Sequence, residues 1–426
     1  MKRTILLLSL VAAGLFVALL PARPLSTIPT VASTVIEPVA SATSVAYCAW
    51  VRTDSALEMS IGFAASRDTQ VTVSVVSEGT VAATEERAVA PFGSIPVSAV
   101  LPVGVEGAIG EFAAGPAGAM AIGDGALGMV AAACPSTVAD RWVLGGGSTL
   151  EGQTLELRLF NPFPEDAKLT IRALSENGSE PDQSLEAVSV PAQSTRTISL
   201  TDTLGFREWL SVEIEQTDGR IIPSYVEQSA TGGITAQSGV ALASEWFFPF
   251  GGIDEVVNNL VLVNPSASPV GYQVATATVG GSGDELDRGS LALRQVAAIA
   301  VDAGDGYILQ ADAPIAAFVI GRSDVGRASV AGSSITASDW LLPGAGALPS
   351  TTIMILNPSV EDVTATVLSR LGQEKVLIPG GGVTAVPIAI SDGGVQVFGT
   401  GPIVVGWYAE GESGFAYAMG IPVVDR

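Results

Sequence analysis

The chain has 426 residues, of which 48% are hydrophobic and 15% charged, with 48 glycines and 25 prolines. That length exceeds what one hydrophobic core ordinarily serves, and the composition suits short strands joined by tight turns, so several all-β domains are expected. The formal charge of −23 disfavours nucleic-acid and anionic-lipid partners, and a chain without histidine cannot use Ser-His-Asp or Cys-His catalysis or histidine-containing metal sites.

Residues 1–23 predict an export signal or a membrane anchor. Lys2 and Arg3 precede a mostly apolar run from Ile5 to Leu20. The length of this run lies between the core of a cleavable signal and a full membrane span, so both interpretations stay open. Either one places the rest of the chain outside the cytoplasm, with the Pro/Ser/Thr/Val-rich residues 24–45 as a flexible stalk.

Cys48 and Cys134 are the two cysteines of the chain. An even pair in an exported chain is most simply a disulfide. The spacing does not match a Cys-x-x-Cys redox motif, and two thiolates cannot form an all-cysteine zinc site. We therefore predict a structural disulfide that brackets most of the first repeat.

Four diverged copies of one unit are predicted over residues 46–138, 139–243, 244–337 and 338–426. Three copies open with a tryptophan before a glycine-containing turn, and a fainter one stands in the first copy: Trp142, Trp246, Trp340 and Trp50. An apolar strand that closes in Asn-Pro follows at Asn161-Pro162, Asn264-Pro265 and Asn357-Pro358. A proline heads a late strand at Pro116, Pro223, Pro314 and Pro402. Landmarks in a constant order indicate an internal repeat.

Each unit has the size and the seven or eight short strands expected of an immunoglobulin-like β-sandwich. In the segment 155–160, a period of two places Leu155, Leu157 and Leu159 on the buried face, and Phe160 is expected to cover the end of the strand. The matching segments 260–263 and 353–356 are apolar on both faces. That pattern predicts central strands that are covered on each side.

The repeated motifs are interpreted as structural. Proline cannot continue a central ladder and asparagine bonds to local backbone, so Asn-Pro stops a strand, while the repeated tryptophans belong to the core. The runs 145–147 and 380–382, each of three glycines, are interpreted as turns because neither leads into a P-loop lysine or a helix. Trp407 and Tyr408 form the aromatic pair selected as a candidate exposed contact, although core packing is the favoured interpretation of both.

The tryptophan before a turn, the strand ending in Asn-Pro, the Val190-Pro191-Ala-Gln-Ser corner and the proline-headed late strand lie behind an amino-terminal anchor or signal. In this combination the chain resembles an actinobacterial family of membrane-anchored or secreted envelope proteins of unknown function. The resemblance implies tandem β-sandwich repeats in an extracytoplasmic location. It implies no catalytic residue.

The leading functional hypothesis is a non-enzymatic structural or interaction protein of the cell envelope, without a cofactor. It would present its sandwiches to an unidentified envelope protein or to wall glycan, and would contact the membrane through the amino-terminal segment alone. The alternative is a carboxylate-based hydrolase of envelope polysaccharide, since paired carboxyl groups cleave glycosidic bonds without histidine. Candidates for that chemistry are Glu245, Asp254, Glu255 and Asp339.

Calcium bound by loop carboxylates is a third hypothesis, for Asp302, Asp305 and Asp312. Calcium prefers clustered oxygen ligands, but the Asp-x-x-Asp-Gly spacing misses the EF-hand pattern and has no suitably placed final glutamate. An acidic turn is therefore the favoured interpretation, and no metal, catalytic or cofactor-binding residue is assigned.

Overall fold

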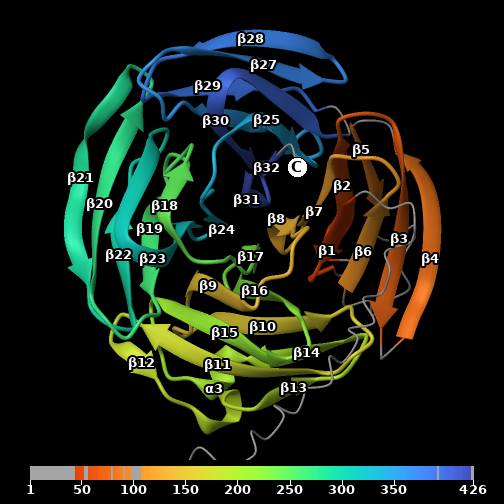
Figure 1. Ribbon diagram of the computed structural model, residues 1–426, viewed down its shortest axis with the longest axis vertical. Coiled ribbons are helices and arrows are strands. Elements are labelled where there is room, and N and C mark those ends of the chain that lie inside the picture. The colour runs from red at the N-terminus through yellow and green to blue at the C-terminus, as the bar shows by residue number, and fades with distance from the viewer. Residues whose placement is uncertain are drawn as a thin grey trace, which may run out of the picture. The chain divides into compact units, whose positions relative to one another are not determined.

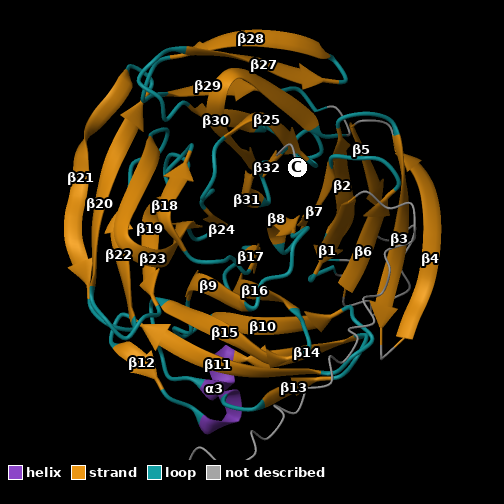
Figure 2. Cartoon of the chain, viewed as in Figure 1, coloured by secondary structure: helices purple, strands orange, loops and turns teal. Residues whose placement is uncertain are grey.

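The computed structural model describes residues 44–51, 56–77, 80–89, 92–96, 107–390 and 393–423. The predicted signal or anchor at 1–23, and all of the predicted stalk except its last two residues, lie outside the described residues. Within the described ranges, none of the helices has the length and apolarity that crossing a membrane requires. These described residues are built almost wholly from strands, with two short helical turns among them (Figure 2).

The four predicted copies are called repeats 1 to 4 below, although the first strands of repeats 1, 3 and 4 begin one or two residues before the predicted bounds. Repeat 1 contains β1 (Ser44–Cys48), β2 (Glu58–Ala65), β3 (Thr69–Ser77), β4 (Thr80–Val89), β5 (Phe92–Pro96), β6 (Gly107–Phe112), β7 (Ala117–Gly125) and β8 (Gly128–Cys134). Repeat 2 contains β9 (Arg141–Gly147), β10 (Gln153–Asn161), β11 (Ala167–Ser175), β12 (Gly178–Glu180), β13 (Val188–Val190), β14 (Ser194–Ser199), β15 (Leu210–Asp218), β16 (Ile222–Ser229) and β17 (Ile234–Ser238), with the helical turns η1 (Gln183–Leu185) and α3 (Leu200–Thr203).

Repeat 3 contains β18 (Ala243–Phe248), β19 (Val257–Asn264), β20 (Val270–Thr278), β21 (Gly281–Leu291), β22 (Gln295–Ala300), β23 (Gly306–Arg322) and β24 (Arg327–Ala331). Repeat 4 contains β25 (Ala337–Leu342), β26 (Thr352–Leu356), β27 (Val363–Ser369), β28 (Gly372–Ile378), β29 (Val383–Pro387), β30 (Val395–Gly411), β31 (Gly414–Met419) and β32 (Ile421–Pro422). Between described residues, every strand pairing joins two strands of the same repeat.

The strand order is the same in all four repeats. One sheet, here called sheet I, is β1-β6-β3-β4 in repeat 1, and the other, sheet II, is β5-β2-β7-β8. Repeat 2 repeats this order with β9-β15-β11-β12 and β14-β10-β16-β17. In repeats 3 and 4 the sixth and seventh strands merge into the 17-residue strands β23 and β30, which pass from sheet I to sheet II. The predicted all-β sandwich fold is confirmed.

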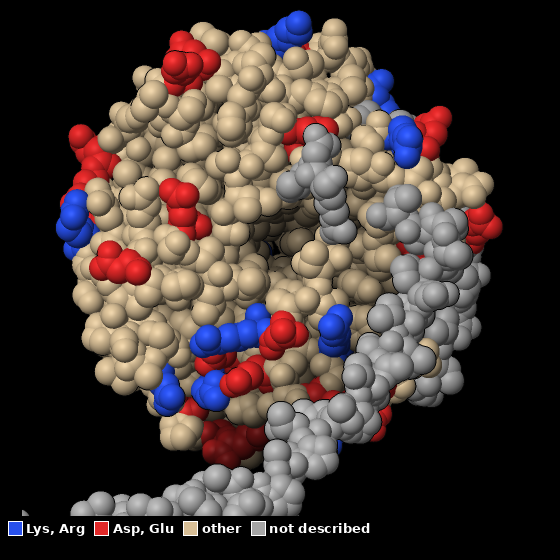
Figure 3. All heavy atoms as spheres, in the orientation of Figure 1, with Lys and Arg blue, Asp and Glu red and all other residues tan. Residues whose placement is uncertain are grey.

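Residues Val39–Arg426 form one unit in which the four repeats follow one another around a ring (Figure 1). The last strand of each sandwich, β8, β17, β24 and β31, lies next to its counterparts at the centre, while β4, β21 and β28 lie at the rim. Sheet I of one repeat faces sheet II of the next. Thus β3 lies against β14, β9 against β19, β18 against β30, and β25 against β2. The face shown in Figure 3 is hollowed near this centre.

Four glycines precede or open the central strands: Gly128, Gly233, Gly326 and Gly414. A Cβ on Gly128 would lie 3.2 Å from the Cα of Gly233, and one on Gly233 would lie 2.9 Å from the Cα of Gly326. A Cβ on Gly326 would lie 3.3 Å from the Cα of Gly414. Backbone of the neighbouring repeat is the nearest obstacle at Gly128 and Gly233, while at Gly326 the Phe415 ring is nearer still, at 2.5 Å, so all three positions need glycine for the strands to meet.

The predicted burial of the second strand is confirmed in each case. On β10, Leu155, Leu157 and Leu159 are fully buried while Glu156 and Arg158 are partly exposed. β19 and β26 are central in their sheets, and residues 260–263 and 353–356 are buried. The second face of β19 is covered by the preceding repeat rather than by its own sandwich, since a Cβ on Gly145 of β9 would lie 3.0 Å from Val263 and would collide with Phe318 of the neighbouring β23.

Two local expectations need correction. Residues 145–147 are the end of β9, fully buried, rather than a turn, because Gly145 and Gly146 pack on repeat 3 and Gly147 packs on Leu155 of its own repeat. Phe160 covers an interface between repeats rather than a strand end: a Cβ on Gly107 of repeat 1 would lie 2.5 Å from the Phe160 ring. By contrast, 380–382 do lie in a turn between β28 and β29.

The Asn-Pro asparagines each tie a strand end to two loops. Asn357 is fully buried, and its Nδ2 donates to the carbonyls of Glu361 at 2.8 Å and Pro379 at 3.2 Å. Its Oδ1 accepts from the backbone nitrogen of Ser359 at 3.0 Å. Asn161 and Asn264 make the corresponding bonds in repeats 2 and 3. The structural interpretation of these residues is confirmed.

The repeated tryptophans are also core residues, as predicted. Trp246 is buried and its Nε1 donates to the carbonyl of Ile315 at 3.0 Å. Trp340 makes the same bond in repeat 4, to the carbonyl of Ile403 at 3.1 Å. In both cases the indole joins the first strand to the long strand at the point where it changes sheets.

Candidate binding groove

An open groove of about 630 Å³ lies on sheet I of repeat 3. Four strands supply its lining: Ser244 and Glu245 from β18, Gly271, Tyr272 and Gln273 from β20, Arg288 and Gly289 from β21, and Gln310, Ala311 and Asp312 from β23. The lining is mostly polar, and its charged side chains are exposed.

Strand register places four polar residues of the groove side by side. Glu245 is opposite Gln310, Gln310 is opposite Gln273, and Gln273 is opposite Arg288. Neighbouring strands lie about 4.8 Å apart, so this row crosses about 14 Å of sheet. Gln310 donates from Nε2 to Glu245 Oε1 at 3.3 Å, which links the first two members. The row presents a carboxylate at one end, a guanidinium at the other and two carboxamides between them.

Gly271 carries no side chain and so leaves room for a carboxylate at the floor of the groove. A Cβ there would collide with the carboxylate of Asp312, which therefore lies over the glycine. Asp312 is two residues beyond Gln310 on β23, so both side chains are on the same face of the sheet. Glu245 and Asp312 thus place two carboxylates in one open groove.

Tyr272 precedes Gln273 on β20, so its side chain points to the opposite face of the sheet from the row. Tyr272 donates from its hydroxyl to Asp287 Oδ2 at 2.9 Å. Burial first, and then this bond and the charge of Asp287, raise the pKa of Tyr272 to about 12, so the phenol stays protonated near neutrality. Arg288 donates from Nη2 to Glu285 Oε2 at 2.6 Å on the exposed surface.

The carboxylates predicted for hydrolysis do not form one group. Glu245 lines the groove, whereas Asp339 lies on β25 of repeat 4, where it accepts from Gln396 Nε2 at 2.9 Å. Asp254 and Glu255 follow β18 in an exposed turn, and Glu255 has a φ of 62°. The charge of Asp254 contributes, after burial, to the raised pKa of Glu410.

The acidic residues weighed for calcium are separated in the same way. Asp302 and Asp305 both precede β23. Burial, and then the negative charge of Asp302 nearby, raise the pKa of Asp305. Asp312 is in the groove, further along β23. In the part of the chain that the structure describes, no three acidic or cysteine side chains gather as metal ligands.

Trp407 is a core residue, as the favoured interpretation has it, so its candidate role as an exposed contact is wrong. Trp407 is fully buried on β30, and Tyr408 is half-buried with its ring centroid 6.1 Å from that of Phe250. Adjacent residues of a strand point to opposite faces, so a pair of neighbours cannot form one exposed patch. Here one face is the interior of repeat 4 and the other packs on repeat 3.

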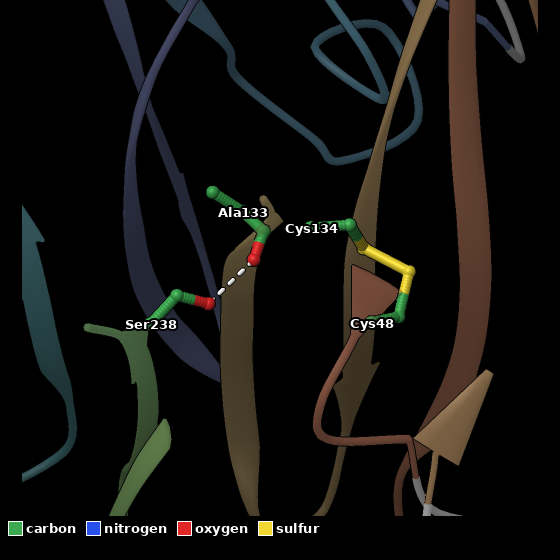
Figure 4. The surroundings of a disulfide bond; sticks show 4 residues. All are labelled: Cys48, Ala133, Cys134 and Ser238. Atoms are coloured by element: carbon green, nitrogen blue, oxygen red, sulfur yellow. Dashed lines mark hydrogen bonds between the residues drawn. A yellow bond between two sulfur atoms is a disulfide. The ribbon is translucent and has the colours of Figure 1, made fainter. Parts of the chain in front are cut away.

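The structure contains the predicted disulfide between Cys48 and Cys134 (Figure 4). Cys48 ends β1 of sheet I and Cys134 ends β8 of sheet II, so the bond joins the two sheets of repeat 1. Next to it, Ser238 of repeat 2 donates from Oγ to the carbonyl of Ala133 at 2.6 Å. The crosslinked end of repeat 1 is therefore also in contact with repeat 2.

Sequence reasoning missed the groove row and the buried ion pairs between repeats 2 and 3. The carboxylate of Glu227 on β16 lies between two arginines of repeat 3. Its Oε1 is 2.7 Å from Arg327 Nη1, and its Oε2 is 3.7 Å from Arg322 Nη2. Arg322 lies over the ring of Trp209 at 4.2 Å. The sequence does contain a signal for the centre of the ring, a glycine at or before the start of the last strand of every repeat. No motif marks the groove.

Comparison with known proteins gives one partial sequence match. A model of a family of unknown function, DUF5719, matches residues 81–244, which run from β4 of repeat 1 through repeat 2. No curated protein matches the chain.

Three solved structures have low similarity to it. A GH2 β-galacturonidase from Eisenbergiella tayi bound to glycerol is 9% identical with a TM-score of 0.14, over 67% of this chain and 45% of that one. The major pilin from Streptococcus pyogenes is 9% identical with a TM-score of 0.15, over 66% and 99%. A bacterial ice-binding adhesin is 9% identical with a TM-score of 0.12, over 72% and 90%. The chain thus spans less than half the galacturonidase, and scores this low support no argument about fold or function. The sequence match links part of the ring to a family without an assigned function.

Proposed function

We propose that the protein is a non-enzymatic binding scaffold of the cell envelope, held outside the membrane. The observation that carries this proposal is the groove on repeat 3, whose polar side chains are fixed by strand register and left accessible, on a ring whose inter-repeat faces are buried. A ring of this kind holds its rim in one geometry, because each repeat is packed against both neighbours. A rigid element that carries exposed polar groups is suited to recognition.

The groove supports binding better than hydrolysis. A glycosidase needs one carboxyl group whose pKa is raised by an apolar environment, so that it can act as an acid near neutrality. Glu245 and Asp312 share the groove, but both side chains are exposed to water in an open depression. Such carboxylates are suited to accepting hydrogen bonds from a ligand.

The proposed location rests on the disulfide and on the amino-terminal segment. Disulfides persist in oxidising compartments outside the cytoplasm. The cationic end and apolar run of residues 1–23 would export the chain or hold it at the membrane. The partner would be envelope glycan or an envelope protein rather than nucleic acid, since the chain carries a formal charge of −23.

Co-sedimentation with isolated envelope tests this function. The purified full chain is mixed with delipidated envelope fragments at about 0.15 M salt, where charge attraction is screened beyond about 8 Å. We expect the chain to sediment with the fragments and an unrelated acidic protein of similar size to remain in solution. Recovery of the chain in the supernatant of every fraction would reject the proposal. Release of soluble reducing sugar from the fragments would instead support the hydrolase alternative.

A further inference from the structure

We infer that the groove of repeat 3 binds a neutral oligosaccharide chain, laid across the row Glu245, Gln310, Gln273 and Arg288. This inference rests on the proposed binding function and names the ligand class and the contact residues. The inference is based on the hydrogen-bonding groups of the row, on the length of the row, and on the lack of an apolar pocket among the described lining residues.

The row alternates hydrogen-bond donors and acceptors at a short, regular interval. Each glutamine carboxamide offers two N–H donors and an acceptor oxygen, the carboxylate accepts and the guanidinium donates. A matching ligand must therefore both donate and accept every few ångströms over about 14 Å, the width of four strands. Hydroxyl groups do both, and a chain of sugars carries them at this density.

The usual modes of peptide recognition do not fit the groove. Strand addition takes place along a sheet edge, whereas the row runs across the face of the sheet from β18 to β21. Helix and polyproline recognition need an apolar or aromatic groove, and the aromatic residue of this lining, Tyr272, turns its ring to the other face of the sheet. Phosphopeptide recognition needs an arginine cluster, and the lining holds a single arginine, Arg288, which is paired with Glu285.

Charge selects a neutral glycan over an anionic one. Glu245 and Asp312 place two carboxylates beside one guanidinium in the groove. The chain as a whole carries a formal charge of −23, which repels polyanions at long range. Anionic envelope polymers are therefore disfavoured at this site.

Repeat 4 shows which part of the row carries specificity. In the same register it places Asp339, Phe398, Thr366 and Lys375. The acid and the base at the two ends are kept, while Phe398 and Thr366 replace the two glutamines. The carboxamide pair is thus the feature that distinguishes the groove of repeat 3 from the equivalent surface of repeat 4.

Titration calorimetry on the full chain tests the inference. The probes are neutral hexasaccharides of glucose, mannose, galactose and N-acetylglucosamine, with oligogalacturonate as the anionic comparison. We expect at least one neutral probe to bind, and Gln273→Ala and Gln310→Ala each to weaken binding about five- to tenfold, as expected for one hydrogen-bonding group. Gln373→Ala removes an exposed glutamine from β28 of repeat 4 and should leave the affinity unchanged.

Each other outcome overturns the inference in a recognisable way. Binding of oligogalacturonate alone would reject the neutral class, and equal affinity of the two groove variants and the wild type would reject the site. If the chain sediments with envelope but binds no neutral probe at millimolar concentration, the inference fails and the proposed function stands. If the chain neither sediments nor binds a probe, both fail.

Discussion

The backbone nitrogen of Gly344 lies 2.7 Å from the point that a Cβ would occupy at Gly62. Gly62 belongs to β2 of the first repeat and Gly344 follows β25 of the last, so this contact closes the ring. The two surfaces are different faces of the repeat, as at the other three junctions. Head-to-tail contacts of this kind form a closed ring when the rotation from each unit to the next adds up to a full turn. Here four repeats complete the circle within one chain.

Gly62→Ala should therefore destabilise the whole ring. The added methyl group would meet backbone atoms, which cannot move aside as a side chain can, and overpacking of this kind costs about 1 to 3 kcal/mol. The urea midpoint of unfolding, followed by tryptophan fluorescence, should fall. Gly280→Ala is the matched control, since its nearest atom would be Thr278 Oγ1 at an ordinary 3.7 Å. Equal midpoints for the two variants would show that the stability of the protein does not depend on the close contact between Gly62 and Gly344.

The sandwich was predictable because its signals are local. An asparagine that ends a strand and a tryptophan that opens a unit are visible in the sequence, and Asn357 and Trp340 have the roles expected of them. The ring was not predictable because its contact surfaces use the residues of an ordinary core. Val261 and Val263 on β19 look like interior residues, and the sequence does not say that glycines of β9 cover them.

The groove was not predictable for a different reason. Glu245, Gln273 and Gln310 come from three strands separated by loops, and register alone brings them into one row. Of this row, the sequence singles out Glu245 alone, as one of four carboxylates for a different chemistry. The exposed contact considered for Trp407 and Tyr408 is wrong because neighbours on a strand face opposite ways and do not form one patch, whereas the favoured core role of Trp407 is confirmed.

Asn357→Asp should cost about 2 to 4 kcal/mol of unfolding free energy, because a buried carboxylate would face carbonyl oxygens that now accept hydrogen bonds. The substitution preserves shape, so packing is unchanged and the loss reports the bonds to Glu361 and Pro379. The free energy follows from urea unfolding at pH 7. Asn177→Asp makes the same change at an exposed turn and should alter stability little. Similar losses at both sites would contradict the role given to the buried amide.

Glu227→Gln should be more damaging than loss of a surface ion pair. The carboxylate compensates two largely buried guanidiniums, Arg322 and Arg327, and burial lowers the pKa of Arg327. Removing one partner of a buried pair typically costs about 3 to 5 kcal/mol. Asp218→Asn, which removes an exposed partner 3.9 Å from Lys168, is the control and should have no measurable effect. If both variants unfold at the wild-type midpoint, the buried pair does not hold repeats 2 and 3 together.

Reduction of the disulfide should lower stability by about 4 to 5 kcal/mol in the chain-entropy model, since the bond closes a long loop. The two cysteines are 86 residues apart in sequence and both are buried. Unfolding with and without dithiothreitol measures the effect, and the double variant Cys48→Ala/Cys134→Ala should match the reduced wild type. The reductant has no other target, because the sequence contains two cysteines. A reduced protein as stable as the oxidised one would show that the ring contacts already restrict this loop.

Glu410→Gln should stabilise the protein at pH 7 and not at pH 4. The pKa of Glu410 is raised, first by burial and then by the negative charge of Asp254 across the junction of repeats 3 and 4. A carboxyl group with a raised pKa in the folded state binds its proton more tightly there than in the unfolded chain. Its contribution to stability is therefore complete below the unfolded value, near 4.5, and is lost as the pH rises through the folded value.

A glutamine side chain at this position does not ionise, so the Glu410→Gln variant avoids this loss at neutral pH. The gain should be small, because Glu410 keeps contact with water and solvent screens its charge. Urea midpoints of the variant and the wild type, compared at pH 4 and pH 7, measure it, with Glu361→Gln at an exposed turn as the control. A gain of the same size at both pH values would mean that the substitution acts through packing, and the electrostatic coupling to Asp254 would then have to be abandoned as its cause.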